Sequence, residues 1–309
     1  MHKTTMLAVC LVTAAGAATA QSELFASGRE IGSANLSTFS LDYTADFAGG
    51  TFSLDAVSFN GAIRDVTGAP LSGGRTGAAF EGGRYFVSNV DVPGLGLWTG
   101  SVDLASGVFT PENDQARTPA LGIPGEPVTA TGDARALGSN SALNAVAGLT
   151  TDSVQFSFDA TTGAAVAPNI ATIVPPLIEA TAFASLTDTG YTISTGGGGP
   201  TLTSIVDPFG DVGGPFVNLF ALPFAAPVAD ASYGLAFDDD TDTLIASVTT
   251  EGLGLTEFWA IEALPGGLIG GVGFLGTVDA EIGGLAYVPA PGVAAVFGVG
   301  GLLAARRRR

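Results

Sequence analysis

A short block of residues recurs along the chain, and it restricts the fold more than any other feature. The block consists of a glycine, two small or apolar residues and an aromatic residue. Its three full copies are Gly77–Phe80, Gly234–Phe237 and Gly284–Tyr287. The last two copies start 50 residues apart, and a partial copy, Thr181–Phe183, ends 54 residues before Phe237. Repeats of about 50 residues that each hold about four short strands are typical of β-propeller blades.

Short runs of alternating apolar and polar residues fill much of the chain between residues 22 and 287. Clear examples are Thr51–Phe59, Ser153–Phe158 and Thr243–Val248. Clusters of Gly, Pro, Asp and Asn separate these runs, which is the pattern of strands and turns. The 45 Gly and 17 Pro residues disfavour long helices. The sequence therefore predicts an all-β body, a β-propeller of five or six blades in which Gly284–Tyr287 closes the ring against an early strand.

A pair of β-sandwich domains is the alternative fold. It is favoured by residues 22–75 and 105–175, which match the repeat only weakly. Hydrophobic residues make up 46% of the chain and include 19 Phe, so either fold has enough apolar material for a sizeable core.

The chain is acidic, with a formal net charge of -18 at pH 7. Lys3 and the four terminal arginines account for five of the 11 cationic residues, so the body between the two ends is more acidic still. Such a body repels nucleic acid and anionic lipid. We therefore expect no nucleic-acid partner.

Side chains that commonly act as nucleophiles or zinc ligands are rare in this chain. His2, Lys3 and Cys10 are the only histidine, lysine and cysteine of the chain. Without the first ten residues, Cys/His zinc sites, Ser-His-Asp or Cys-His catalysis and Schiff-base chemistry are excluded. Carboxylates remain, and they suit either glycoside hydrolysis by an acid pair or binding of a hard cation such as Ca2+.

The first 20 residues have the three parts of a secretory signal peptide. Lys3 lies in a short polar start, an apolar run follows from Met6 to Ala17, and Ala18 and Ala20 form a small-x-small cleavage site before Gln21. An N-terminal membrane anchor is the alternative, but the apolar run is shorter than the ~20 residues that a membrane span needs. We expect export with cleavage after Ala20, leaving residues 21–287 as an extracellular body.

The last 22 residues form a second three-part segment. Val288, Pro289, Ala290 and Pro291 precede Gly292, an apolar stretch covers residues 293–305, and Arg306, Arg307, Arg308 and Arg309 end the chain. Such a stretch predicts a short transmembrane helix with its arginines on the cytoplasmic side. An ordinary C-terminal anchor is the alternative to a sorting signal.

This tail resembles the PEP-CTERM sorting domain, which consists of Val-Pro-Glu-Pro, a hydrophobic helix and an arginine cluster. Ala290 stands where that family usually has Glu. The resemblance covers residues 288–309 and implies transient retention in the inner membrane, processing by an exosortase-type enzyme, and delivery to the cell surface or an extracellular polysaccharide matrix. Within the body, the block at Gly234 with the strand pattern at Thr243 is similar to blades of secreted bacterial propeller-like proteins.

Asp238, Asp240 and Asp242 form the densest acidic cluster and are candidate Ca2+ ligands. The EF-hand pattern fails, because Thr243 and Thr249 occupy the places of its glycine and its bidentate glutamate. A solvated hairpin tip is the alternative interpretation, since Asp and Thr favour turns.

Four aromatic residues could stack on sugar rings or could belong to the core: Tyr85, Trp98, Tyr191 and Trp259. No group of residues has catalytic spacing. We therefore expect a non-catalytic structural or interaction protein of the cell envelope or the extracellular polysaccharide matrix. A carboxylate-based glycoside hydrolase, or a sugar-binding lectin, on a β-propeller is the alternative.

Overall fold

The computed structural model describes one compact unit, Glu23–Pro289, in most of its length. The described residues are 23–112, 120–123, 126–129, 134–140, 143–150, 154–164, 166, 170–171, 178–184, 189–195, 199–206, 216–223, 231–250, 254–265 and 267–288. The predicted signal peptide with Ala18 and Ala20, and the predicted tail from Pro289 onward, lie outside them. Within these ranges no helix is long and apolar enough to cross a membrane.

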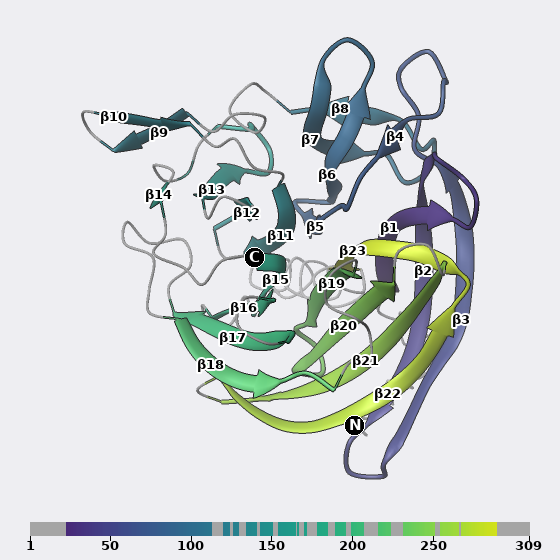
Figure 1. Ribbon diagram of the computed structural model, residues 1–309, viewed down its shortest axis with the longest axis vertical. Helices are drawn as coiled ribbons and strands as arrows, with labels where there is room; N and C mark the ends of the chain where they lie inside the picture. Colours follow the sequence, from purple (N-terminus) through teal and green to yellow (C-terminus); the bar gives the residue numbers. More distant parts are fainter. Residues whose placement is uncertain are drawn as a thin grey trace, which may run out of the picture. The chain divides into compact units, whose positions relative to one another are not determined.

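The regular structure of the described residues is β-strand, which confirms the predicted all-β class, and it forms five blades (Figure 1). Blade 1 is β23 (Ala280–Val288), β1 (Glu23–Glu30), β2 (Leu36–Asp46) and β3 (Thr51–Ala62). Blade 2 is β5 (Ala78–Glu81), β6 (Arg84–Val92), β7 (Gly96–Val102) and β8 (Phe109–Pro111), with β4 (Ser72–Gly73) also paired to β6. Blade 3 is β11 (Ala134–Asn140), β12 (Ala145–Thr150), β13 (Val154–Asp159) and β14 (Ile170–Ala171).

The remaining two blades complete the ring. Blade 4 is β15 (Ile178–Ala184), β16 (Thr189–Ser194), β17 (Thr201–Val206) and β18 (Phe216–Ala221). Blade 5 is β19 (Ala231–Asp238), β20 (Thr243–Thr250), β21 (Leu255–Leu264) and β22 (Leu268–Val278). A separate hairpin pairs β9 (Ala120–Ile123) with β10 (Glu126–Thr129). The innermost strand of each blade contacts the next, in the order β5, β11, β15, β19, β23 and back to β5.

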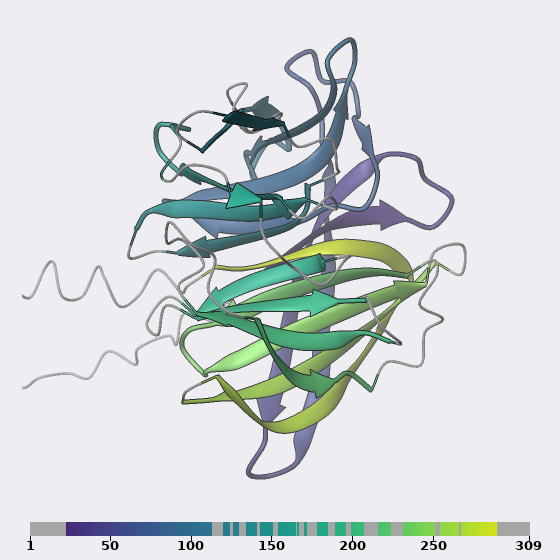
Figure 2. The same ribbon diagram turned by 60° about the vertical axis from the view of Figure 1, so that its left-hand side comes forward.

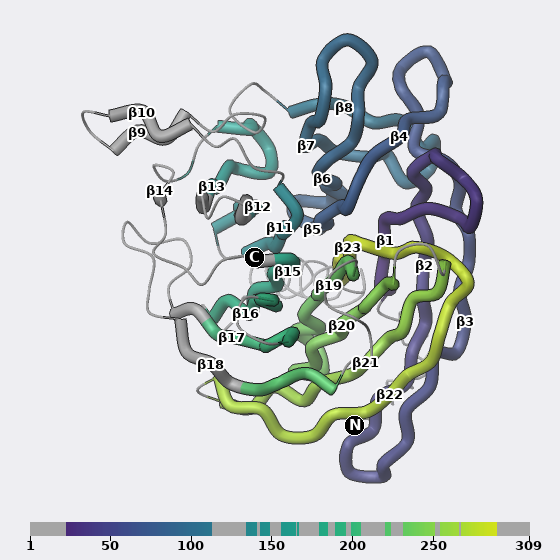
Figure 3. Tube along the Cα trace, in the orientation of Figure 1, coloured from purple at the N-terminus to yellow at the C-terminus, as the bar shows by residue number. Residues whose placement is uncertain are grey.

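The ring closes as the repeat predicted. β23 carries the last copy of the repeated block and pairs antiparallel with β1, from Glu23 opposite Val288 to Glu30 opposite Ala280. The tube in Figure 3 shows the C-terminal strand beside the N-terminal one. Residues 22–75 match the repeat weakly because they supply three outer strands of a blade whose inner strand comes from the other end of the chain. The β-sandwich alternative is wrong for this reason.

The glycine of the repeated block permits close approach of neighbouring inner strands. A Cβ atom built on Gly77 would lie 2.7 Å from the backbone oxygen of Arg135, and one built on Gly284 would lie 2.9 Å from the backbone nitrogen of Ala78. Real Cβ atoms do not come this close to backbone atoms. Only glycine therefore lets these strands meet around the axis of the ring.

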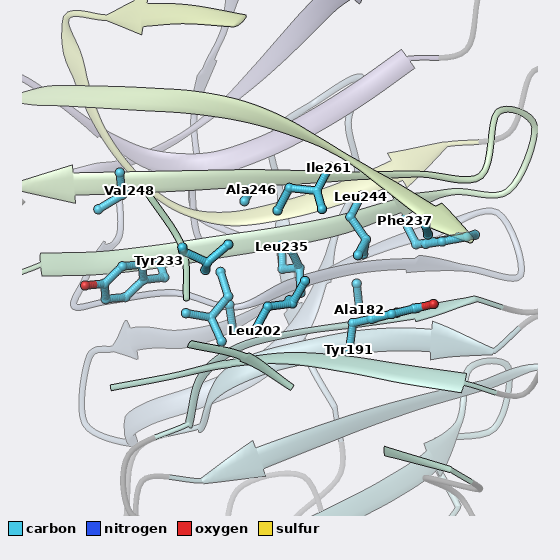
Figure 4. Close-up of a cluster of buried hydrophobic side chains, with 14 of the residues drawn as sticks. Ala182, Tyr191, Leu202, Tyr233, Leu235, Phe237, Leu244, Ala246, Val248 and Ile261 are labelled. Atoms are coloured by element: carbon cyan, nitrogen blue, oxygen red, sulfur yellow. The ribbon is translucent and has the colours of Figure 1, made fainter. Parts of the chain in front are cut away.

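Apolar side chains fill the interfaces between blades. In one hydrophobic cluster, Tyr191 and Leu202 of blade 4 pack with Leu235, Leu244 and Ile261 of blade 5, and all five are buried. Figure 4 shows the two sets of side chains on facing strands, and Figure 2 shows the sheets that carry them. Burying one such leucine or isoleucine contributes about 1.5–3 kcal/mol, so these interfaces hold neighbouring blades together.

Candidate functional site

The inner strands enclose an axial cavity, which is lined by residues of all five blades. Its aromatic mouth is formed by Phe80, Ser139, Phe183, Phe237, Asp239 and Tyr287. Its waist is formed by Ala78, Leu137, Thr181, Leu235 and Leu285. On the other side of the waist the inner strands pack together without a void, and we call this side the arginine end because Arg135 lies there with Tyr233, next to Arg75 and Glu179. The repeated block therefore supplies most of the lining, because it lies on the inner strands.

The aromatic mouth takes its rings from the last position of the repeated block. Phe237 stacks on Tyr191 of the preceding blade, with ring centroids 6.0 Å apart and an interplanar angle of 3°. Phe183 packs over Gly138, where a Cβ atom would lie 2.5 Å from the ring. The cavity at this mouth has a volume of about 30 Å3, which is room for one or two water molecules.

A buried hydroxyl lies at the waist. Thr181 occupies the place that leucine has in the equivalent blocks, Leu235 and Leu285. Its side chain is 1% exposed, and its Oγ1 has no hydrogen-bond partner in the described part of the chain. Sequence reasoning missed this residue, although a comparison of the blocks would have found one polar member among apolar ones.

At the arginine end, two equivalent β-bulges place opposite charges together. The pairing of β11 shifts at Arg135, and that of β15 shifts at Glu179. Arg135 Nη1 donates to both carboxylate oxygens of Glu179, at 3.1 and 3.3 Å, and Arg75 Nη1 lies 3.9 Å from the same carboxylate. Glu179 is only 6% exposed. Bulges redirect side chains, and here they make a buried ion pair that the sequence pattern did not predict.

Tyr233 lies beside this ion pair. Its burial, together with the nearby carboxylate of Glu179, raises the pKa of the Tyr233 phenol to about 12, while Arg75 acts in the opposite direction. The phenol therefore stays neutral at physiological pH. The arginine end thus presents guanidinium groups and a phenol as hydrogen-bond donors.

The predicted Ca2+ ligands lie on the hairpin between β19 and β20. Asp240 and Asp242 are exposed, whereas Asp238 is 3% exposed. Asp238 Oδ1 accepts the backbone N–H groups of Asp240 and Thr241, and its Oδ2 accepts the Tyr43 hydroxyl at 2.5 Å. No group of three or more His, Cys, Asp and Glu side chains within the described ranges could hold a metal ion. The Ca2+ hypothesis stays a prediction, and the observed role of Asp238 is to hold its turn and join it to blade 1.

Two tyrosines of blade 1 bind this turn. Tyr43 donates to Asp238, and the Tyr287 hydroxyl donates to Asp240 Oδ2 at 2.7 Å. Burial first, and then the Asp238 carboxylate, raise the pKa of Tyr43, so its hydroxyl remains a donor. The acidic hairpin is therefore fixed to the rim of the aromatic mouth.

We expect Asp238→Ala to lower the free energy of unfolding by about 2 kcal/mol, because it leaves the hydroxyl of the half-buried Tyr43 and the turn N–H groups without their acceptor. Asp242→Gly on the same hairpin should have the opposite sign, since Asp242 has a φ of 52°, a conformation that favours glycine. Urea unfolding of both variants measures the two effects. Equal destabilisation by both would contradict the turn-holding role of Asp238.

Other aspartates hold turns in the same way. Asp103 Oδ1 accepts the N–H of Ala105 at 2.8 Å, and Asp159 Oδ1 accepts that of Thr162 at 2.7 Å. Both turns have Ser or Thr at the fourth position and a glycine with positive φ at the fifth, Gly107 and Gly163. Sequence analysis did not identify this Asp-x-x-Ser/Thr-Gly spacing, which explains part of the acidic composition.

These turns predict a loss of stability in acid. Backbone N–H groups hold the pKa of Asp103 below its usual range, and those together with the Thr162 hydroxyl do so for Asp159. Stability from a lowered pKa is present above the unfolded value and is lost as pH falls through the folded value. We expect the melting temperature of the wild type to fall more steeply below about pH 4 than that of an Asp103→Asn/Asp159→Asn variant. Parallel curves would refute the prediction.

The aromatic residues considered for sugar stacking are mostly core residues. Tyr85, Trp98 and Tyr191 are buried, at 1%, 7% and 2% exposure. Trp259 is half-buried and lies 5.0 Å from the ring of Phe274 between centroids. The core interpretation is confirmed for the first three.

Five blades and ring closure by β23 define the chain as a β-propeller protein. No family model and no curated protein sequence matches it. It is similar to a chain of the crystal structure of the nidogen/laminin complex, with 9% identity, a TM-score of 0.43 and coverage of 87% of this chain and 99% of that chain. It is also similar to TolB from Acinetobacter baumannii, with 10% identity, a TM-score of 0.45 and coverage of 84% and 53%.

A further similarity is to the β-propeller domain of Cps50 (Swd1) from Myceliophteria thermophila. The identity is 12%, the TM-score is 0.32, and the match covers 60% of this chain and 54% of that chain. At such identities the similarities concern the fold alone.

Proposed function

We propose that this protein is a non-catalytic structural or interaction protein of the cell envelope or the extracellular polysaccharide matrix. The observation that carries the non-catalytic part is that two buried carboxylates near the axis, Glu179 and Asp238, are engaged by partners within the fold. Glu179 pairs with Arg135, and Asp238 holds its turn and accepts the Tyr43 hydroxyl. Residues 21–309 also contain no His, Cys or Lys for nucleophilic or metal chemistry.

A polysaccharide panel tests this part of the proposal. The full-length chain should bind acidic or amino polysaccharides in a pull-down and release no reducing ends from any of them. Release of sugar from one panel member would replace the proposal by a glycosidase that uses Asp or Glu.

The second part of the proposal concerns sorting. A cleaved signal peptide at residues 1–20 and a PEP-CTERM-like tail at residues 288–309 would take the chain through the inner membrane to an exosortase-type enzyme and then to the cell surface or matrix. Val288 is the last residue of β23, so cleavage within residues 289–292 would leave the closing strand whole.

Intact-mass measurement on the extracellular fraction tests the sorting. We expect a species that begins at Gln21 and lacks residues 293–309. A species that keeps Arg306 to Arg309 would refute tail processing, and Ala290 in place of Glu would be its explanation.

Cation bridging to anionic polysaccharide is the third part of the proposal. The exposed carboxylates of Asp240 and Asp242 would carry it, together with the acidic surface of the body. Calorimetric titration with Ca2+ and a melting curve in Ca2+ test the cation bridging. The absence of both binding heat and a shift of the melting temperature at millimolar Ca2+ would refute it.

A further inference from the structure

The waist of the axial cavity, next to the aromatic mouth, contains a buried hydroxyl that has no hydrogen-bond partner among the described residues. Thr181 is 1% exposed, and its Oγ1 has no hydrogen-bond partner among the described residues. The side chains around it at the waist are aliphatic, namely Ala78, Leu137, Leu235 and Leu285. Buried hydroxyls are normally paired, and the cavity at this point has a volume of about 30 Å3. A polar group the size of a water molecule fits there.

The charge at this mouth favours a cation. Asp239 lines the same cavity, and Asp240 and Asp242 lie on the same hairpin. The chain has a net charge of -18, which raises the local concentration of cations further. The guest that meets Thr181 should therefore be positively charged.

The remaining lining distinguishes between kinds of cation. Ca2+ takes six to eight oxygen ligands, several of them carboxylates. Here Asp239 is the one carboxylate among the lining residues that the structure describes, and Phe80, Phe183, Phe237 and Tyr287 contribute aromatic rings. Aromatic rings attract organic ammonium groups and pack against methylene groups. A primary ammonium has three N–H donors and is similar to water in size.

We propose that the aromatic mouth binds a primary ammonium group. Its N–H donors reach Thr181 Oγ1 and the Asp239 carboxylate, and its carbon stem lies among the aromatic rings. Residues 21–309 contain no lysine, so a side-chain amine must come from another molecule. The ammonium group could belong to an amino sugar of the matrix or to a lysine side chain of a partner protein. If the source is the matrix, the inference rests on the proposed function.

Calorimetric titration of the full-length chain tests the proposal with two pairs of probes. Glucosamine trimer is compared with its N-acetylated form, and Nα-acetyl-lysine amide is compared with its ε-acetylated form. We expect only the free amines to bind. The amine with the higher affinity, glucosamine trimer or Nα-acetyl-lysine amide, indicates whether an amino sugar or a lysine side chain is the natural ligand. Equal binding of acetylated and free forms, or no binding of either amine, would overturn the proposal.

Variants place the binding at this mouth. Asp239→Asn and Thr181→Val should each weaken amine binding at least about tenfold, which is typical for loss of a hydrogen bond to a charged group. Thr181→Ser, which keeps the hydroxyl, should bind nearly as the wild type. Asp91→Asn is the control, because it removes one carboxylate charge from an exposed position on β6 that does not line the cavity, and it should leave binding unchanged.

The outcomes separate this proposal from the function it rests on. Thr181→Val changes a buried position, so Asp239→Asn at the half-buried turn decides the matter if the threonine variant does not fold. Unchanged affinity of Asp239→Asn would overturn the ammonium site. If the wild type still binds matrix polysaccharide in that case, the interaction role stands without this site.

Discussion

Ending the chain at Asp279 is expected to prevent the body from folding. This truncation removes β23, the inner strand of blade 1 and the only described partner on that side of β1. Ile282 and Leu285 are 0% and 1% exposed, and their burial alone contributes about 3–6 kcal/mol. A domain has a total stability of about 5–15 kcal/mol, so these two side chains alone account for a large share of it.

The truncation also removes hydrogen-bond partners from blade 5. The Thr249 hydroxyl donates to the carbonyl of Ile282 at 2.7 Å, and the Thr256 hydroxyl donates to that of Ala280 at 2.6 Å. Both threonines are fully buried in the intact chain, and of their hydroxyl hydrogen bonds only the one between the two hydroxyls, at 2.6 Å, would remain. We expect circular dichroism to show no cooperative melting transition for this variant.

A chain that ends at Gly292 is the matched control, because it keeps all of β23. It should melt like the full-length chain. A cooperative transition for the chain that ends at Asp279 would contradict the role of β23 in closing the ring.

Gly77→Ala is expected to lower the free energy of unfolding by about 1–3 kcal/mol, the usual cost of forcing extra volume into a packed interior. The new methyl group would lie 2.7 Å from the backbone oxygen of Arg135 and 2.8 Å from the backbone nitrogen of Leu137. Backbone atoms of a neighbouring blade cannot turn away as a side chain can. The inner strands of blades 2 and 3 would have to separate.

Gly74→Ala is the control for this substitution. It lies three residues away, has no heavy atom within 4 Å of the new Cβ position, and does not have a positive φ. Urea unfolding should show little change for Gly74→Ala and a clear loss for Gly77→Ala. Equal effects would mean that glycine is needed here for chain flexibility rather than for close approach.

The repeated block predicted the most about the fold. It marked the inner strands β5, β15, β19 and β23, and it predicted that the last of them closes the ring. This was possible because the inner position makes similar demands in most blades, namely a glycine for close approach in blades 1, 2 and 5 and an aromatic ring in all blades but blade 3. Blade 3 escaped detection because it has Gly138 and Ser139 where the other blocks have alanine and an aromatic residue.

The sequence predicted less about the candidate site than about the fold. Asp238, Asp240 and Asp242 were singled out as one cluster, yet Asp238 is buried and occupied by its own turn and by Tyr43, which is 195 positions away in the chain. Asp239, which lies in the same acidic run and lines the axial cavity, was not among the candidate ligands. Spacing along a turn does not say which carboxylate points inward.

The sequence by itself determined the all-β class, the repeat and its closing strand, because alternation of side chains is a local requirement of every strand and the close-packed glycine recurs in blades 1, 2 and 5. Only the tertiary structure decided what meets at the axis. Arg135 and Glu179 are brought together by bulges in two neighbouring strands, and Thr181 and Asp239 line one cavity because five strands converge there. These contacts join residues from different blades. Their geometry depends on how the blades pack against one another, and a local sequence pattern does not predict that packing.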